Sequence, residues 1–263
     1  MSSANLLAAL ARVKLSTAAH LPFSSSPHRH FSRSTNTTML EIACFNATSA
    51  IAAAQAGADR IELCADYAAG GVTPSLSTLQ DVRKKVKIPI NVMIRPRGGD
   101  FNYSDDEFEL MKKEIEMLKP FASGFVFGIL MVNRYVDPTR NRDLVEIAAP
   151  LPCTFHRAID ETDDLEEAVE AVENCGFKSI LTSGGYKTAA EGATALHLLH
   201  FFRPNTVSLI VGGGVRSTNV EDLKRRTTLE WFHSAAITTP GEDVDAEEVR
   251  KMKDILSKLK WKQ

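Results

Sequence analysis

The sequence predicts a single-domain (β/α)8 barrel, a TIM barrel of the α/β class. Eight short apolar or β-branched runs recur along residues 39–263, each is followed by a stretch with helical periodicity, and together they fill this length of chain. Strands that alternate with helices pair in parallel, and eight such units close into a barrel. An open doubly wound sheet is the alternative. Its first strand would lead into a Gly-x-Gly-x-x-Gly turn, which this chain lacks.

The expected strands are short and combine an apolar stretch with a polar end, as in buried parallel sheets. Taken in order along the chain, they are predicted at 40–44, 59–64, 89–95, 124–131, 152–156, 178–182, 207–212 and 229–233.

The intervening helices are predicted from apolar residues that recur every three or four positions. Thr48 and Ser104 are predicted N-caps because a hydroxyl oxygen there can accept a free backbone N–H, and Pro74 precedes a further helix start. Helices are expected, among others, at Thr48–Ala56, Ser75–Val86, Ser104–Leu118, Leu165–Cys175, Ala189–Phe202 and Asp245–Leu259.

Length and composition set limits on the function. The 263 residues suffice for one large core, and a net charge of −2 gives no general attraction to nucleic acid or to an anionic membrane. No apolar run approaches the roughly 20 residues that span a bilayer. The four cysteines lack Cys-x-x-Cys spacing, so they are expected to be reduced thiols of an intracellular, cytoplasmic protein.

Residues 1–38 differ in composition from the rest and are set apart from the barrel domain at 39–263. They hold basic residues and many Ser, Ala and Thr, but the first carboxylate of the chain is Glu41. This composition is typical of a mitochondrial transit peptide, which predicts a mitochondrial location for the form that keeps it. The alternatives are a disordered tail and a shorter cytoplasmic form that starts at Met39.

Polar residues at the strand ends predict a site at one mouth of the barrel, because the carboxyl ends of all eight strands meet there. Arg95 and Arg97 follow the third strand on a loop stiffened by Pro96, and guanidinium groups suit carboxylate or phosphate. Salt bridges to internal acids are the alternative. Glycine amides after strands six and seven can also bind an anion, or can serve only to turn the chain. The predicted anion-binding residues are Arg95, Arg97, Ser183, Gly184, Gly213 and Gly214.

Candidate acid–base residues lie at the same strand ends. A histidine oriented by a carboxylate is the arrangement that general acid–base catalysis requires, although a histidine at a strand end is often only structural. The predicted catalytic candidates are Glu41, Glu62, His156, Asp160 and His233.

Several motifs resemble the CutC copper homeostasis family, in order and from Met39 onward. They are Leu40-Glu-Ile-Ala-Cys44, Gly57-Ala-Asp-Arg-Ile-Glu-Leu-Cys64, Gly70-Gly-Val-Thr-Pro-Ser75, Met93-Ile-Arg-Pro-Arg-Gly-Gly-Asp-Phe101, Thr154-Phe-His-Arg-Ala158, Leu181-Thr-Ser-Gly184 and Glu230 to Ser234. The resemblance implies a TIM barrel, a homo-oligomer (dimer or tetramer) and a role in intracellular copper handling. It also carries the family's copper ligands onto Cys44 and Cys64. Trp231-Phe232 is bulkier than the family pattern suggests.

Two function classes stay open. In the first, a copper homeostasis protein binds Cu(I) through Cys44 and Cys64, since thiolate is a soft ligand for a soft ion. Strand alternation opposes this pairing, because Glu62 and Cys64 share a face whereas Glu41 and Cys44 lie on opposite faces. In the second, a barrel enzyme without a metal acts on a small anionic or phosphorylated metabolite.

Overall fold

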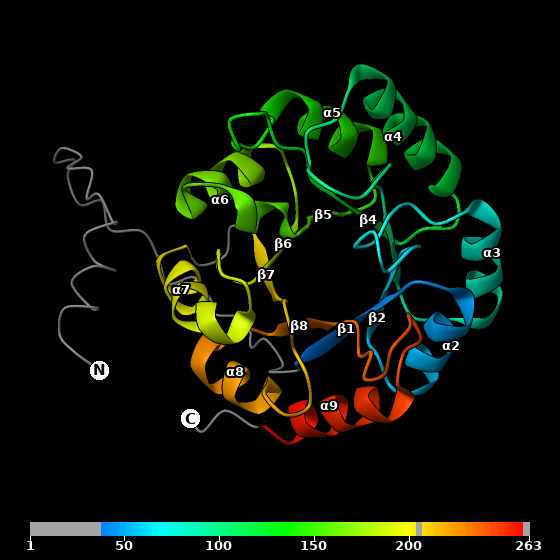
Figure 1. Cartoon of the computed structure of the whole chain (residues 1–263), viewed down its shortest axis with the longest axis vertical. Helices are drawn as coiled ribbons and strands as arrows, with labels where there is room; N and C mark the ends of the chain where they lie inside the picture. Colours follow the sequence, from blue (N-terminus) through cyan, green and yellow to red (C-terminus); the bar gives the residue numbers. More distant parts are fainter. Residues whose placement is uncertain (1–37, 204–206, 260–263) are drawn as a thin grey trace, which may run out of the picture. The chain divides into compact units, whose positions relative to one another are not determined.

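The computed structural model describes residues 38–203 and 207–259, and it confirms the predicted (β/α)8 barrel. Eight parallel strands close into a ring, and the helices surround it (Figure 1). Within the described residues, no helix combines the length and the apolar character needed to cross a membrane. Apart from Thr38, the transit-peptide prediction for residues 1–38 lies outside the described residues.

The strands follow the chain order around the barrel, so each one pairs with its sequence neighbours and the last one pairs with the first. Their bounds are β1 Met39–Cys44, β2 Arg60–Leu63, β3 Ile90–Met93, β4 Gly124–Phe127, β5 Cys153–Phe155, β6 Ser179–Thr182, β7 Ser208–Val211 and β8 Trp231–Ser234.

One α-helix separates each pair of consecutive strands, a short 3-10 helix precedes the α-helix between β5 and β6, and the last helix follows β8. The bounds are α2 Ala47–Gln55, α3 Leu76–Lys85, α4 Asp105–Leu118, α5 Pro138–Ala148, the short 3-10 helix η1 Arg157–Glu161, α6 Leu165–Asn174, α7 Ala189–Phe202, α8 Val220–Thr227 and α9 Ala246–Lys258.

The predicted helix starts are partly confirmed. Ser104 caps α4, with its side chain accepting the Glu107 N–H while the Glu107 carboxylate accepts the Ser104 N–H. The prediction for Thr48 is wrong, because α2 begins two residues earlier and its N-cap is Asn46. The Asn46 side chain accepts the Ser49 N–H at 2.8 Å. Asparagine and threonine can both cap a helix, so composition alone did not decide between them.

The fourth strand is shorter than the predicted 124–131 and ends at Phe127. At Gly128 the chain passes so close to the ring of His156 that a Cβ would lie 2.8 Å from its Nδ1. Leu130 then forms only an isolated bridge to Val136. The apolar sequence therefore continues beyond Phe127, although the strand ends there and the chain turns away beside the ring of His156.

Two clusters of buried apolar residues follow from the alternation of side chains along the strands. The larger cluster joins the outward faces of the strands, such as Leu40 and Ile42, to the helices. The smaller cluster lies toward the carboxyl ends of the strands and consists of Ala43, Phe45, Cys64, Met93, Val126 and Ile237. The site lies among and beside the residues of the smaller cluster.

Candidate functional site

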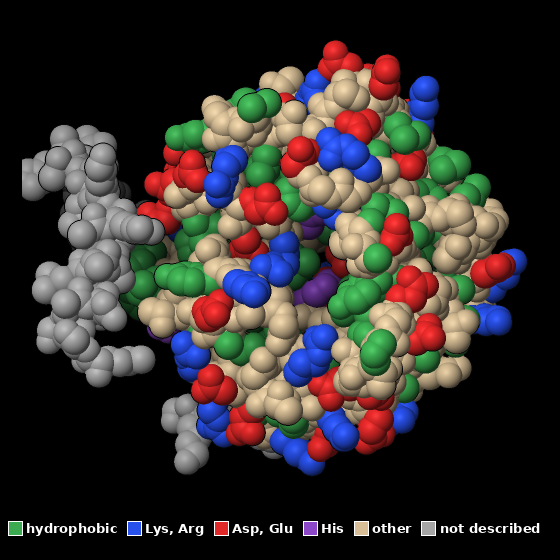
Figure 2. Space-filling view, viewed as in Figure 1, with side chains coloured by type: hydrophobic (Ala, Val, Ile, Leu, Met, Phe, Trp, Pro, Cys, Tyr) green, Lys and Arg blue, Asp and Glu red, His purple; other side chains and the backbone are tan. Residues whose placement is uncertain are grey.

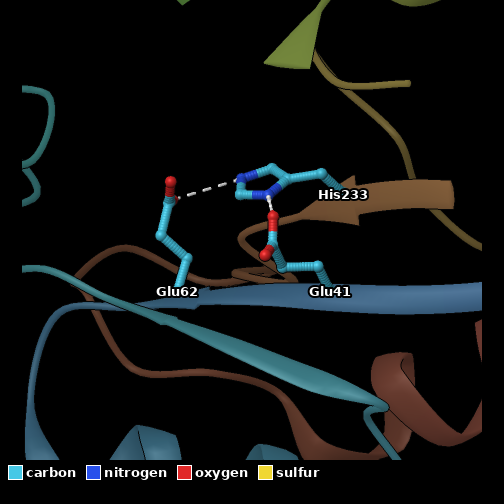
Figure 3. A group of neighbouring side chains, drawn as sticks. All are labelled: Glu41, Glu62 and His233. Carbon is cyan, nitrogen blue, oxygen red and sulfur yellow. Dashed lines mark hydrogen bonds and ion pairs between the residues drawn. The ribbon is translucent and has the colours of Figure 1, made fainter. Parts of the chain in front are cut away.

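Three ionisable side chains meet inside the barrel because of the strand register. Glu41 on β1 lies opposite both Arg60 on β2 and His233 on β8, and Glu62 points to the same side of β2 as Arg60. Figure 3 shows the imidazole of His233 between the two carboxylates, which come from neighbouring strands. Residues 192 positions apart therefore become direct partners.

The contacts in this group, which we call the Glu–His–Glu cluster (Glu41, His233 and Glu62), are close. His233 Nδ1 lies 2.9 Å from Glu41 Oε1, and its Nε2 lies 3.6 Å from Glu62 Oε2. Arg60 forms an ion pair with the other oxygen of Glu41, and its guanidinium lies 3.9 Å from the centre of the Trp231 ring. Glu41 and Glu62 are 1% and 3% exposed, so these charges interact with little screening by water.

The surroundings separate the pKa values of the two carboxyl groups. Burial raises the pKa of Glu62 to about 6, and the charge of Glu41 adds to this shift while His233 opposes it. Burial also acts on Glu41, but Arg60 and His233 outweigh it and lower the pKa of Glu41 to about 2. For His233, burial is outweighed by the charge of Glu62 and the hydrogen bond to Glu41, so its pKa is raised. Carboxyl groups with separated pKa values are typical of acid–base sites.

Replacement of Glu62 by glutamine is expected to stabilise the protein above pH 6. A carboxyl whose pKa rises from 4.5 to about 6 on folding contributes stability below pH 4.5, and this contribution is lost as the pH rises through 6. Glutamine resembles the protonated form, so Glu62→Gln should gain about 2 kcal/mol in the free energy of unfolding between pH 4 and pH 8 relative to the wild type. Urea unfolding at both pH values measures this difference, and a difference independent of pH would contradict the expectation.

The Glu–His–Glu cluster lies at one wall of a cavity of about 400 Å³ at the carboxyl end of the strands. Figure 2 shows this opening as a central hollow in which histidine atoms lie deepest, with Lys or Arg atoms at its edge. Side chains from seven of the eight strand ends or the loops after them line it. Those that carry polar or ionisable groups include Glu62, Cys64, Arg95, His156, Arg157, Arg216, His233 and Ser234.

Two of the cavity arginines are held without a carboxylate partner among the described residues. Arg95 donates to the carbonyl oxygens of Ala69, Gly71 and Gly99, and its Nε has no partner although it is buried. Arg216 donates to the carbonyl oxygens of Val215 and Ile237 and to the hydroxyl of Ser234. Neutral acceptors thus orient both guanidinium groups, and neither forms a salt bridge within residues 38–203 and 207–259, which suits the binding of an anion.

His156 faces the same cavity as a neutral imidazole. Burial, together with the charge of Arg95, lowers the pKa of His156 to about 3. The Ala158 N–H donates to its Nδ1 at 3.4 Å, and its Nε2 is buried without a partner. The predicted histidines 156 and 233 therefore line one cavity with pKa values shifted in opposite directions.

Asp160 does not line the cavity but forms hydrogen bonds and an ion pair with residues next to it. Its carboxylate accepts hydrogen bonds from Thr182, Gly185 and both the N–H and the hydroxyl of Ser183, and it forms an ion pair with Arg157. Of the predicted glycines, Gly213 and Gly214 line the cavity, whereas Gly184 packs against α7. Asp160 thus ties the loop after β5 to the loop after β6 and fixes Arg157 in the wall.

Arg97 lies apart from the cavity residues. Its guanidinium is paired with Asp100 and Glu107 and stacks on the ring of Tyr103 at 5.2 Å. Of the two arginines that flank Pro96, only Arg95 contributes to the cavity wall. For Arg97 the geometry matches the alternative of a salt bridge to internal acids.

The two predicted copper ligands lie in different clusters. Cys44 packs with Leu40 and Ile42 in the larger cluster, and Cys64 belongs to the smaller one and lines the cavity. This is the separation that strand alternation predicts. Burial and the charge of Glu62 raise the pKa of both thiols well above the usual value, which favours the protonated form over the thiolate that binds metals.

The predicted set of site residues omitted three arginines of the site. Arg60 alternates with Glu62 along β2, Arg157 directly follows His156, and Arg216 follows the glycine run after β7. Their positions relative to these candidates are the signal that could have identified them. Phe45, Tyr67 and Phe101, which line the cavity as an aromatic wall, carried no such signal.

Comparison with known proteins gives consistent matches over the barrel. Residues 38–238 match the family model described as the CutC family. A human protein named copper homeostasis protein cutC homolog is 40% identical over 205 residues, which is 78% of this chain and 75% of that protein. A CutC protein of Mesorhizobium japonicum is 38% identical over 204 residues, covering 77% of this chain and 79% of that protein. The crystal structure of a CutC protein from Streptococcus agalactiae superimposes with a TM-score of 0.72 at 30% identity, covering 77% of this chain and all of that one.

Proposed function

The chain belongs to the CutC family, and from this membership we propose that it acts in copper homeostasis, the role stated in the names of its mammalian relatives. We further propose that its molecular activity resides in the cavity at the carboxyl end of the strands. There it acts on a small anionic or phosphorylated metabolite.

The observation that carries this proposal is the pair of cavity arginines without carboxylate partners. Arg95 is 6% exposed, and a buried cation without a counter-ion is costly unless a bound anion supplies the opposite charge. Gly213 and Gly214 also belong to the wall of this cavity, beside the loop that leads to α8. Such a wall attracts a phosphate or a carboxylate and repels a cation.

The Glu–His–Glu cluster supplies the proposed chemistry. Glu62 has a pKa of about 6, its Oε1 is buried without a hydrogen-bond partner, and it lines the cavity. A carboxylate of this kind accepts a proton from a ligand near neutral pH and returns it, while His233 lies between this carboxylate and that of Glu41. The reaction class supported here is proton transfer on an anionic substrate.

Inorganic phosphate tests the anion site. Arg95→Met and Arg216→Met are each expected to weaken phosphate binding by about tenfold or more, since each removes one charge-assisted contact. Arg97→Met is the matched control, because it lies on the same loop but is paired outside the cavity, and binding should be unchanged. Isothermal titration calorimetry measures the dissociation constants. Equal affinity of all four proteins, or no binding by the wild type, would refute the anion site.

Binding of Cu(I) is the second candidate, and the position of Cys64 favours it. Its thiol lines the cavity beside Met93, so two soft sulfur ligands are accessible from the same opening. Cys44 would have to cross from the larger cluster to join them.

Titration of the reduced protein with Cu(I) against a competing chelator distinguishes these ligands. If both cysteines bind copper, Cys44→Ser and Cys64→Ser each abolish the site. If Cu(I) binds from the cavity, only Cys64→Ser does so, and Cys44→Ser serves as the matched control. Binding that survives both changes would exclude transfer of copper by these thiols.

We keep the cytoplasm as the proposed location, in line with relatives from bacteria and mammals. The mitochondrial alternative depends on residues 1–38. The homo-oligomer stays a prediction.

A further inference from the structure

His156 presents a hydrogen-bond donor that no group of the described chain accepts. Because the Ala158 N–H donates to Nδ1, the proton of the neutral ring lies on Nε2. Nε2 is buried without a partner, and the residue as a whole is only 4% exposed. An unsatisfied buried donor is costly, and His156 lines the cavity, so a ligand whose oxygen reaches this donor would supply the missing acceptor.

The ring is held in place by its surroundings. The ring of Phe101 packs edge-on against it at 4.8 Å between centroids, and Phe155 does so at 6.0 Å. On a further side, Gly128 has no side chain and thus allows the backbone to approach the imidazole. The direction of Nε2 is therefore fixed before a ligand binds, as recognition of one particular oxygen requires.

The Nε2–H donor of His156 belongs to a neutral imidazole, and this determines which kind of ligand oxygen it prefers. Arg95 lies near enough to disfavour a second positive charge on His156. A neutral N–H adds little to the binding of an anionic group that arginines already hold. It is suited to a carbonyl oxygen, on which negative charge develops as the carbonyl is polarised.

We infer that the ligand of this cavity is a small carbonyl compound bearing a phosphate or carboxylate group, with its carbonyl oxygen bound to Nε2 of His156 and its anionic group facing Arg95 and Arg216. This inference rests on the proposed anion site and deepens it by naming the substrate class. It adds His156 as the residue that distinguishes a carbonyl compound from other small anions.

Matched pairs of probes test the inference on the wild-type protein. Acetonylphosphonate and propylphosphonate differ only in the carbonyl oxygen, as do acetoacetate and butyrate. Calorimetry should show that the carbonyl member of at least one pair binds about tenfold more tightly, since the other member leaves the donor unpaired. The pair with the higher affinity tells whether the anionic group is a phosphate or a carboxylate.

Variants of His156 assign the preference to this residue. In His156→Phe an aromatic ring is kept without a donor, so the preference should vanish and the two members of each pair should bind with equal affinity. His156→Gln keeps an N–H donor and should recover part of the preference. Thermal unfolding checks that both variants fold.

The outcomes separate the inference from the proposed function. If no probe binds the wild type, the anion site itself is absent. If both members of each pair bind equally, the anion site stands and the role of His156 is refuted. A preference that persists in His156→Phe also refutes the assignment to His156.

Discussion

Glu41→Leu is expected to lower the free energy of unfolding by about 3–5 kcal/mol, the usual cost of removing one partner from a buried ion pair. Glu41 is 1% exposed and contacts both Arg60 and His233, so its loss removes the carboxylate that pairs with the guanidinium and with a buried imidazole. Urea unfolding at pH 7 measures the change as a lower midpoint at an unchanged slope.

The matching control removes the charge that Glu41 balances. Arg60→Met in the Glu41→Leu background should restore most of the lost stability, because apolar side chains of similar volume then replace the buried pair. Glu221→Leu, which breaks the exposed pair with Arg225 on α8, should change stability by less than about 1 kcal/mol. A double variant as unstable as Glu41→Leu alone would show that Glu41 does not stabilise the fold through its ion pair with Arg60.

His156 is expected to make the fold sensitive to acid. Its pKa falls from 6.5 to about 3 on folding because of burial and Arg95, so the unfolded chain takes up a proton well before the folded one. A lowered pKa in the folded state contributes stability above pH 6.5 that is lost as the pH falls toward 3. Between pH 6.5 and pH 4 the wild type should therefore lose about 3 kcal/mol more than His156→Phe.

Two measurements check this expectation. Urea unfolding of both proteins at several pH values gives the difference, in which the contributions of Glu62 and His233 cancel because both proteins contain them. Nuclear magnetic resonance of the imidazole should show no titration of His156 between pH 8 and pH 5. Parallel stability curves for the two proteins, or a ring that titrates in this range, would contradict the expectation.

The sequence was sufficient to predict the barrel because its eight strands are short, apolar and separated by clear helical periodicity. The same regularity placed Glu62, His156 and His233 at one mouth, and alternation along β1 separated Cys44 from Cys64. These inferences depend only on topology and on the period of a strand. They need no knowledge of individual side-chain conformations.

What the sequence did not reveal depends on register and on loop conformation. Glu41 contacts His233 because β1 pairs with β8 when the barrel closes, and the register of this pairing places the two residues opposite each other. Neither strand contains a local sequence pattern that predicts this register. Arg95 and Arg97 look equivalent as a pair around a proline, yet one turns to the cavity and the other to Glu107. Only the folded loop distinguishes them.

Arg95 and Arg216 form no salt bridge to a carboxylate of the described residues, and this has a consequence for the amount of protein in a cell. A ligand that binds the folded chain and supplies the missing negative charge shifts the unfolding equilibrium toward the native state. Chains that unfold more often are removed faster by proteases. If the proposed anionic metabolite binds this cavity, the steady-state abundance of the protein should therefore rise and fall with the supply of that metabolite, without any change in transcription.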